Sequence, residues 1–357
     1  MKQRVHSLDW LRGMMAVSIM LYHMSGQTDT GTLLGKLGVY GVCVFFILSG
    51  LSMAIAYDAV LHGFRGAAEF VVRRLFRIWP LLWLVLALVV IPAHFQGLHY
   101  SGWQIALNLT TLFGFISPTH YINMGAWSIG NEMVYYALTP GLIAAYHWRK
   151  AMGNLLTLIS ALIGLYFAFR VIDPAVHLRY QWAQYINPLN NLYFYCAGIA
   201  MYYNFRSITI PAPWRLPLFT LIVLAFVSFP TSGDQIGIVA GPLRVAFSCM
   251  AIALVFAFYQ CAPALPKFLD NKLEWLGLIS YGIYLLHPIA LIWTKAALHW
   301  LGIANPAVIH TATIVITLAA AHLVYQVLER PMMRLGKILI KPGRQATRPD
   351  GISQTLD

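Results

Sequence analysis

Long apolar runs recur along the whole chain, and each is about as long as a helix that crosses a membrane. A span needs about 20 apolar residues, and about ten such runs alternate with short polar or basic segments. They predict helices at 7–25, 37–57, 78–96, 127–147, 151–170, 186–205, 215–230, 236–259, 274–299 and 305–328. The pattern predicts an all-α fold, a polytopic integral membrane helical bundle of about ten transmembrane helices.

The segment 103–117 is shorter and more polar than these runs. It is either an eleventh span or a re-entrant or interfacial piece, and the positive charges favour the second. Cytoplasmic loops of membrane proteins collect Lys and Arg, and with ten spans most of the 24 basic residues fall on one side. An eleventh span would move Arg149, Arg206 and the basic tail to the other side. We therefore expect both termini to be cytoplasmic and 97–126 to be one long non-cytoplasmic loop.

Composition agrees with a membrane protein. The chain is 59% hydrophobic and 10% charged, against about 25% charged residues in soluble domains. The net charge of +12 follows from this topology and suits anionic lipid, so we expect no nucleic-acid partner. We expect one membrane domain over residues 1–334 and a basic, disordered cytoplasmic tail over 335–357. The four cysteines have no metal-type spacing, and no HExxH motif occurs, so no metal site is expected.

The first predicted helix carries ionisable residues, which are costly in hydrocarbon and rarely kept there without a function. Asp9 and Arg12 lie near its start and His23 near its end. Eleven residues make about three turns, so Arg12 and His23 share one face, roughly 16 Å apart. One interpretation is an interfacial ion pair and a polar histidine. The other is a general base at His23, with Arg12 holding an anion or a carbonyl deeper toward the cytoplasm.

Three arginines precede the third predicted span, in the sequence RRLFR at 73–77. Their i,i+3 and i,i+4 spacing places Arg73, Arg74 and Arg77 on one side of a helix. They are either a cytoplasmic anchor, with Glu69 pairing to Arg73, or a phosphate clamp, for which guanidinium forks are well suited. The diphosphate and ribose phosphate of coenzyme A would fit such a clamp.

Polar residues also begin the fourth predicted span, in the sequence GAWSIGNEMVYY at 125–136. Ser128 is either a helix cap or a site residue, and Trp127 and Tyr136 are either core aromatics or part of a site. Glu132 lies within the first turns of the span, where an ionisable residue is a site candidate.

A polar stripe lies within the ninth predicted span, in the sequence ISYGIYLLHPIAL at 279–291. Ser280, Tyr284 and His287 are spaced i, i+4, i+7, and Pro288 predicts a kink near Tyr284. A histidine in mid-span is either a hydrogen-bonded core residue or a functional one. Further candidates are Ser49 in FFILSG and Glu329 in LERP. Arg244 is a further intramembrane charge with no partner assigned.

Together and in this order, these motifs resemble the acyltransferase-3 family of membrane O-acyltransferases. The similarity extends from residue 8 to residue 331. The shared elements are Arg12 with His23, the arginines at 73–77, Trp127, Ser128, Glu132 and Tyr136, Phe45 to Gly50, Ser280 to His287, and Glu329 with Pro331.

The resemblance implies that residues 1–334 are a membrane acyltransferase domain in the bacterial cytoplasmic (inner) membrane. It would move an acyl group, most simply acetyl, from cytoplasmic acyl-CoA to a hydroxyl of a glycan or glycolipid. Acyl-CoA (acetyl-CoA) would be a co-substrate, and no cofactor is bound permanently. Under this interpretation His23 is the general base, Arg12 positions the thioester, and Glu132 orients His23 or the sugar. The clamp of Arg73, Arg74 and Arg77 would bind the donor. Substrate or structural support is expected from Asp9, Ser49, Trp127, Ser128, Tyr136, Tyr284, His287 and Glu329.

Some members of the family carry an additional esterase-like domain, and we expect none in this chain. Transfer would therefore finish in the membrane site, or a partner such as a glycan-assembly protein would complete it. The alternative function is a secondary transporter of a glycan or an anionic metabolite. Transporters usually repeat their halves, and residues 1–180 and 180–357 show no correspondence.

Overall fold

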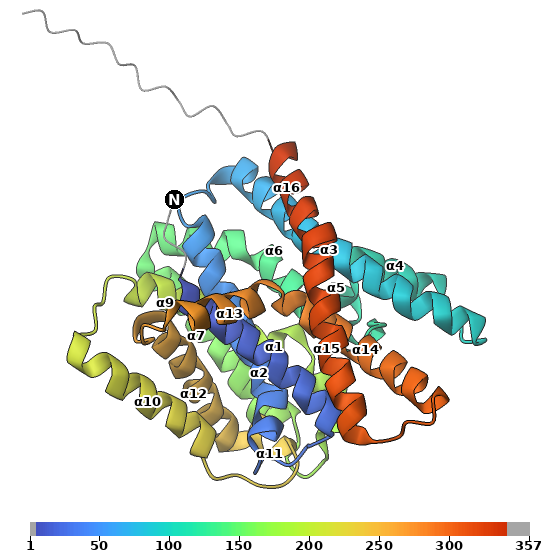
Figure 1. The fold of residues 1–357 in the computed structure, drawn as a ribbon. Coiled ribbons are helices and arrows are strands. Elements are labelled where there is room, and N and C mark those ends of the chain that lie inside the picture. The colour runs from blue at the N-terminus through green and yellow to red at the C-terminus, as the bar shows by residue number, and fades with distance from the viewer. Residues whose placement is uncertain (1–4, 341–357) are drawn as a thin grey trace, which may run out of the picture.

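The computed structural model describes residues 5–340, and over these residues the chain forms helices and no strand. The longer helices build a single bundle (Figure 1). In chain order they are α1 (His6–Ser25), α2 (Leu33–Tyr57), α3 (Gly63–Phe95), α6 (Ala126–Trp148), α7 (Lys150–Tyr166), α9 (Pro188–Phe205), α10 (Ala212–Ser228), α12 (Gly241–Gln260), α13 (Lys267–Leu278), α14 (Ser280–Trp300), α15 (Pro306–Val324) and α16 (Arg330–Leu339). The short ones are α4 (Gly102–Thr110), α5 (Phe113–Ile116), η1 (Pro118–His120), η2 (Phe167–Val171), η3 (Leu178–Gln181), α8 (Trp182–Tyr185), α11 (Ile236–Val239) and η4 (Tyr325–Glu329).

The centre of the bundle is the pair α1 and α2, which pack against each other (Figure 1). Helices α13 and α14 cover α1, and α9 and α12 cover α2. Helices α2 and α9 approach closely because each has a glycine at the crossing. A side chain at Gly50 would collide with the Tyr195 carbonyl, and one at Gly198 with the Ile47 carbonyl. Such small-residue contacts are typical of helices packed within a membrane.

Within residues 5–340, five helical segments are long and apolar enough to cross a membrane, and the bent pair α13–α14 makes a sixth. The five are Leu33–Tyr57, Gly63–Phe95, Lys150–Val171, Gly241–Gln260 and Pro306–Leu339. The prediction of a membrane helical protein is confirmed, whereas the count of ten spans stays a prediction. Helices α1, α6 and α9 are not among these segments, and each carries polar residues inside the bundle. The buried examples are Asp9, Ser128, Asn131, Asn190 and Asn191.

Several predicted boundaries differ from the structure. Helix α3 begins at Gly63 rather than at 78, because amphipathic helical turns precede the apolar part and join it without a break. The last span continues through η4 into α16 and ends at Leu339. The remainder of the predicted tail, 341–357, lies outside the described residues. The segment 103–117 forms α4 and α5, of nine and four residues, both too short to span a membrane.

The predicted kink near Tyr284 stays a prediction. Helix α14 runs through Pro288, and the break of 64° lies earlier, between α13 and α14. Ile279 leaves the helical conformation there, with φ −94° and ψ 4°, and the Ser280 hydroxyl donates to the Gly277 carbonyl at 2.8 Å. The broken turn thus keeps a partner for one carbonyl of α13.

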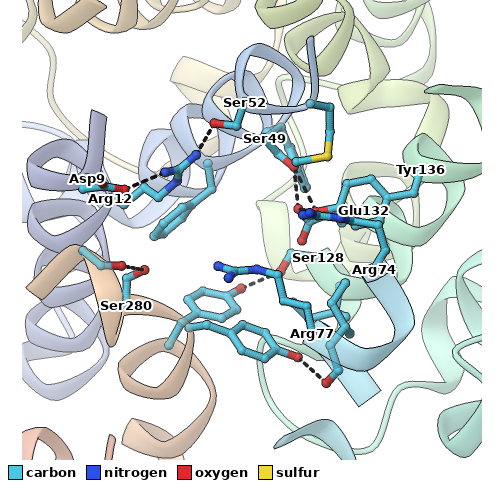
Figure 2. Close-up of a pocket in the computed structure, with 18 of the residues that line it drawn as sticks. Asp9, Arg12, Ser49, Ser52, Arg74, Arg77, Ser128, Glu132, Tyr136 and Ser280 are labelled. Carbon is cyan, nitrogen blue, oxygen red and sulfur yellow. Dashed lines mark hydrogen bonds and ion pairs between the residues drawn. The ribbon is translucent and has the colours of Figure 1, made fainter. Parts of the chain in front are cut away.

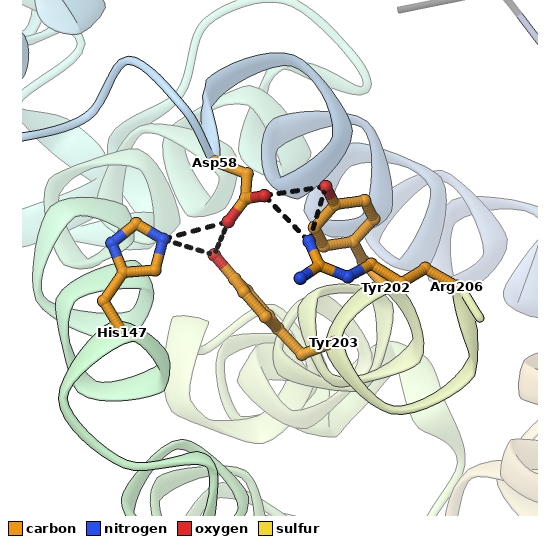
Figure 3. A network of polar contacts seen from close by, with 5 residues as sticks. All are labelled: Asp58, His147, Tyr202, Tyr203 and Arg206. Atoms are coloured by element: carbon orange, nitrogen blue, oxygen red, sulfur yellow. Dashed lines mark hydrogen bonds and ion pairs between the residues drawn. The ribbon is translucent and has the colours of Figure 1, made fainter.

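A polar network joins α2, α6 and α9 at one end of the bundle (Figure 3). The Asp58 carboxylate accepts hydrogen bonds of 2.8 Å from Tyr202, Tyr203 and Arg206, and His147 Nε2 lies 2.9 Å from it. Burial opposes ionisation of Asp58. The hydrogen bonds outweigh this cost and hold the pKa of Asp58 well below its ordinary value. Asp58 therefore stabilises the packing of three helices as a carboxylate.

Candidate functional site

A charged cavity of about 320 Å³ opens between α1, α2, α3, α6, α13 and α14 (Figure 2). Its ionisable and hydroxyl side chains come from five of these helices and from η4. They are Asp9, Arg12, Ser49, Ser52, Arg74, Arg77, Ser128, Glu132, Tyr136, Ser280, Tyr281, Tyr284 and Tyr325. Residues from distant parts of the sequence therefore meet around one space.

On α1, Arg12 and Asp9 form the predicted i,i+3 ion pair, with 2.9 Å between Nη1 and Oδ1. The second terminal nitrogen of Arg12 donates to the Ser52 hydroxyl and to the Leu48 carbonyl of α2. Because the carboxylate, hydroxyl and carbonyl all accept from it, Arg12 is held as a fixed cation at the cavity wall.

On α6, Glu132 accepts hydrogen bonds from two hydroxyls. Ser49 donates to its Oε1 at 2.5 Å, and Tyr136 donates to the same oxygen. These contacts link α2 to α6, and the described residues provide no hydrogen bond to the second carboxylate oxygen. Glu132 thus presents an acceptor to the cavity. It does not contact His23, which lines a different cavity, so the expected orientation of His23 by Glu132 is not seen.

The three arginines of α3 do not act as one cluster. Arg74 donates to the Tyr57 hydroxyl at 2.8 Å, and Arg77 lies 3.6 Å from the Met333 sulfur. Both line the charged cavity, and Figure 2 shows Arg77 reaching into the space between Arg12 and Glu132. Arg73 does not line it and lies 3.7 Å from Glu69. Consecutive helical residues differ in direction by about 100°, so adjacent arginines need not share a target.

Arg77 and Arg74 lack an acidic partner within ion-pair distance among the described residues. Cations in a largely enclosed cavity need counter-charge or strong acceptors. The pair is therefore suited to bind an anion.

A second, aromatic cavity of about 300 Å³ lies at the other end of α1. Its lining contains His23 and none of the Lys, Arg, Asp or Glu side chains among the described residues. Aromatic side chains dominate it: Tyr22, Tyr121, Trp127, Trp182, Tyr185 and Tyr284. Val42 and Tyr284 line both cavities, so these two residues form the partition between them.

The partition is held by hydroxyl groups of α6 and α14. The Ser128 and Tyr284 oxygens lie 2.8 Å apart, and the Gly125 carbonyl accepts from Ser128 at 2.9 Å and from Tyr284 at 3.1 Å. Gly125 adopts φ +85°, a conformation that glycine reaches without strain, at the start of α6. The predicted α14 stripe thus crosses the molecule, with Ser280 at the charged cavity and Tyr284 at the partition.

His287 continues this stripe and contacts His23. His23 Nδ1 lies 2.8 Å from His287 Nε2, and the two rings stack with centroids 5.1 Å apart. His287 Nδ1 lies 3.0 Å from the Ile283 carbonyl, which can only accept. In the neutral pair, His287 Nδ1 therefore carries its proton, His287 Nε2 accepts from His23 Nδ1, and His23 Nε2 keeps a free lone pair. This arrangement can remove a proton from a hydroxyl.

Two other sequence candidates lie apart from both cavities. Glu329 is buried at the end of the π-helix η4, and its Oε1 has no hydrogen-bond partner among the described residues. Arg244 is 1% exposed on α12 and donates to Asn190 and Asn191, with Tyr193 and Phe194 beneath its guanidinium. Amide oxygens and aromatic faces therefore replace the carboxylate that its charge would normally require.

Sequence reasoning missed most of the aromatic cavity, including Tyr22, Tyr121, Trp182, Tyr185 and Gln235. Tyr22 comes from α1. The other four come from loops and short helices, which carry no helical periodicity. One signal was present: the stretch YQWAQY at 180–185 is dense in aromatics within an otherwise polar connection.

The sequence matches one family model over nearly its whole length. Residues 5–326 match the acyltransferase-3 model, described as an acyltransferase domain. No solved structure matches the chain significantly.

Relatives of known name agree with the family match. The chain is 28% identical over 331 residues to the exopolysaccharide production protein ExoZ of Rhizobium meliloti, covering 89% of this chain and 96% of the relative. It is 24% identical over 373 residues to the peptidoglycan O-acetyltransferase OatA of Listeria monocytogenes, covering 94% of this chain. That alignment covers 57% of OatA, so the chain spans little more than half of that relative. With the family match over most of its length and a bundle of apolar helices, the chain belongs to the acyltransferase-3 family and is an integral membrane enzyme that transfers acyl groups other than aminoacyl groups.

Proposed function

We propose that this enzyme is an O-acetyltransferase that moves an acetyl group from cytoplasmic acetyl-CoA to a hydroxyl of a glycan or glycolipid. The observation that carries the proposal is the division of α1 between two cavities. Arg12 lines the charged cavity and His23 the aromatic one, and Val42 and Tyr284 line both. A donor with anionic groups and an acceptor with hydroxyl groups would meet at this partition.

The charged cavity is the proposed donor site. Arg74 and Arg77 would bind phosphate oxygens of coenzyme A, for which guanidinium groups are well suited. The second carboxylate oxygen of Glu132 would accept from an amide of the pantetheine arm. Arg73, paired with Glu69 outside the cavity, would contribute positive charge at its approach and no direct contact.

His23 is the proposed general base. Its Nε2 would take the proton of the acceptor hydroxyl while that oxygen attacks the thioester carbonyl carbon. A C–O bond forms, the C–S bond breaks, and the proton passes from His23 to the departing coenzyme A sulfur, so the products are the O-acetyl ester and free coenzyme A. His287 is a positioning residue that selects the tautomer of His23. Arg12 would stabilise the charge that develops on the donor side.

We infer the orientation of the bundle in the membrane from the positions of the positive charges. The end of the bundle with Arg74, Arg77, Arg149 and Arg206 would face the cytoplasm of a bacterial cell, with both termini on that side of the inner membrane. The aromatic cavity would then face outward, where surface glycans are assembled. The printed names of two relatives, an exopolysaccharide production protein and a peptidoglycan O-acetyltransferase, support a glycan acceptor without naming it.

The test uses the full-length purified protein with acetyl-CoA and a panel of soluble oligosaccharides. Release of coenzyme A is followed with a thiol reagent, and acetylated product by mass spectrometry. We expect acetylated oligosaccharide from the wild-type protein and strong losses in the His23→Gln and Arg74→Gln variants. If both variants keep full turnover, the proposed mechanism is wrong. Acceptor-dependent turnover with succinyl-CoA but not with acetyl-CoA would overturn the choice of acetyl.

A further inference from the structure

The aromatic cavity has a wall of mutually packed rings. The rings of Trp127, Trp182 and Tyr185 lie with pairwise centroid distances of 5.2 to 5.7 Å. Trp182 Nε1 donates to the Tyr121 hydroxyl at 2.9 Å, which joins a fourth ring to the wall. Because the rings brace one another, they form a fixed apolar surface that does not have to be ordered when a ligand binds.

Three polar atoms in this lining have no hydrogen-bond partner among residues 5–340. Trp127 is 6% exposed and Tyr185 2% exposed, yet the described residues offer no hydrogen bond to the indole N–H of the first or the hydroxyl of the second. His23 uses only Nδ1, in its contact with His287. These three atoms belong to side chains that line one cavity and make no internal hydrogen bond, so they are available to a ligand that carries hydroxyl groups.

Two further polar side chains in the lining are already engaged. Tyr22 donates to Gln235 at 3.1 Å, and Gln235 donates to the Gly35 carbonyl at 3.1 Å. These contacts fix neutral groups at the cavity edge. Since no acidic or permanently basic side chain among the described residues lines the space, a charged sugar would gain no counter-charge there.

We propose that the aromatic cavity is a binding site for a single neutral pyranose ring of the acceptor. A pyranose has an apolar C–H face and a rim of hydroxyls. Its face would pack on the ring wall, and its rim would meet the free Trp127, Tyr185 and His23 atoms. The proposal rests on the proposed function, because it takes the hydroxyl at His23 as the one that is acylated. It adds a selection for uncharged over acidic sugars.

The test measures binding of methyl β-D-glucopyranoside and of its acidic counterpart, methyl β-D-glucopyranosiduronate. The full-length protein is held in a detergent without a sugar head group, and saturation-transfer NMR detects the ring protons in contact. We expect the glucoside to bind and the glucuronide to bind more weakly. Tyr185→Phe removes one hydrogen bond and should weaken glucoside binding about two- to tenfold, and Trp182→Ala should weaken it further.

Tyr180→Phe is the matched control, because Tyr180 lies in the same connection, is 67% exposed and does not line the cavity. The site is wrong if the glucoside does not bind, or if Tyr185→Phe and Trp182→Ala bind it as the wild type does. Stronger binding of the glucuronide would overturn the choice of a neutral sugar. If acetyl transfer depends on His23 but the glucoside does not bind, this inference is wrong and the proposed function stands. If the glucoside binds but no acyl group is transferred, the proposed function is wrong and the sugar site stands.

Discussion

The charged and aromatic cavities are similar in volume, about 320 and 300 Å³, and opposite in chemistry. The charged cavity has arginines from α1 and α3 and carboxylates from α1 and α6. The aromatic cavity has packed rings and one imidazole. They share α1, Val42 and Tyr284, so a single helix presents a cation to one and a base to the other. The polar residues of α1 are therefore divided between two cavities and do not form one cluster.

The largest expected effect comes from the base of the aromatic cavity. His23→Gln keeps a polar side chain of similar size but cannot accept a proton, so transfer should fall about 10²- to 10⁴-fold. Acetylated oligosaccharide is measured under saturating donor. A loss smaller than threefold would mean that His23 is not the base.

Loss of a donor contact should be the next largest effect. Arg77→Gln removes a charged hydrogen bond and should raise the KM for acetyl-CoA about 10- to 100-fold with little change in kcat. Arg73→Gln is the matched control from the same helix, because Arg73 pairs with Glu69 away from the cavity. Equal effects of the two variants would show that the arginines act only through general positive charge.

We expect His287 to affect activity only through its contact with His23. His287→Leu removes the acceptor of the His23 Nδ1 proton and should lower kcat about tenfold or more, with the KM for acetyl-CoA unchanged. His287→Gln restores an acceptor oxygen and should recover part of the loss. If the Gln and Leu variants are equally impaired, the role of His287 is packing rather than selection of the tautomer.

We expect the partition residue Tyr284 to keep the two cavities separate. Tyr284→Ala opens a path between the cavities, so water should reach the thioester more easily. We expect the ratio of acetyl-CoA hydrolysis to transfer to rise, measured as free coenzyme A against acetylated product. Tyr166→Ala, an exposed tyrosine on α7, serves as the control. An unchanged ratio would argue against Tyr284 as the barrier.

The smallest effect on activity, and a clear one on stability, is expected at Asp58, which lies outside both cavities. Its pKa is below the ordinary value, so its contribution is complete above about pH 4 and is lost as the pH falls further. Asp58→Asn should lower stability by about 2 kcal/mol at neutral pH and flatten the acid dependence. Thermal aggregation of detergent-solubilised protein at several pH values measures both. The same acid dependence in wild type and variant would contradict this role.

The sequence predicted those parts of the site that depend on helical spacing. The Asp9–Arg12 pair and the stripe from Ser280 to His287 follow from 3.6 residues per turn, whereas the shared face of Arg12 and His23 stays a prediction. The contact of His23 with His287 links residues 264 positions apart and depends on packing of α1 against α14, which no local pattern specifies. Apart from Trp127, the ring wall of the aromatic cavity was missed for the same reason.

The ends of the helices were harder to predict from the sequence than their existence. Helix α3 begins 15 residues before its apolar run. Its first turns are amphipathic, and a search for long apolar runs detects only the apolar part of the helix. The break at Ile279 was not predicted, because the distortion expected in this segment was a proline kink near Tyr284. Here Ser280 supports the broken turn, and its contact with Gly277 becomes visible only in three dimensions.

The division of donor and acceptor sites between two cavities is tested most directly by acetyl-CoA binding without turnover. Equilibrium binding is measured for the wild type, His23→Gln and an Arg74→Gln, Arg77→Gln double variant of the full-length protein. The account predicts a Kd within about twofold of wild type for His23→Gln and a Kd weakened about tenfold or more for the double variant. Unchanged binding by the double variant, or a comparable loss in His23→Gln, would contradict the division.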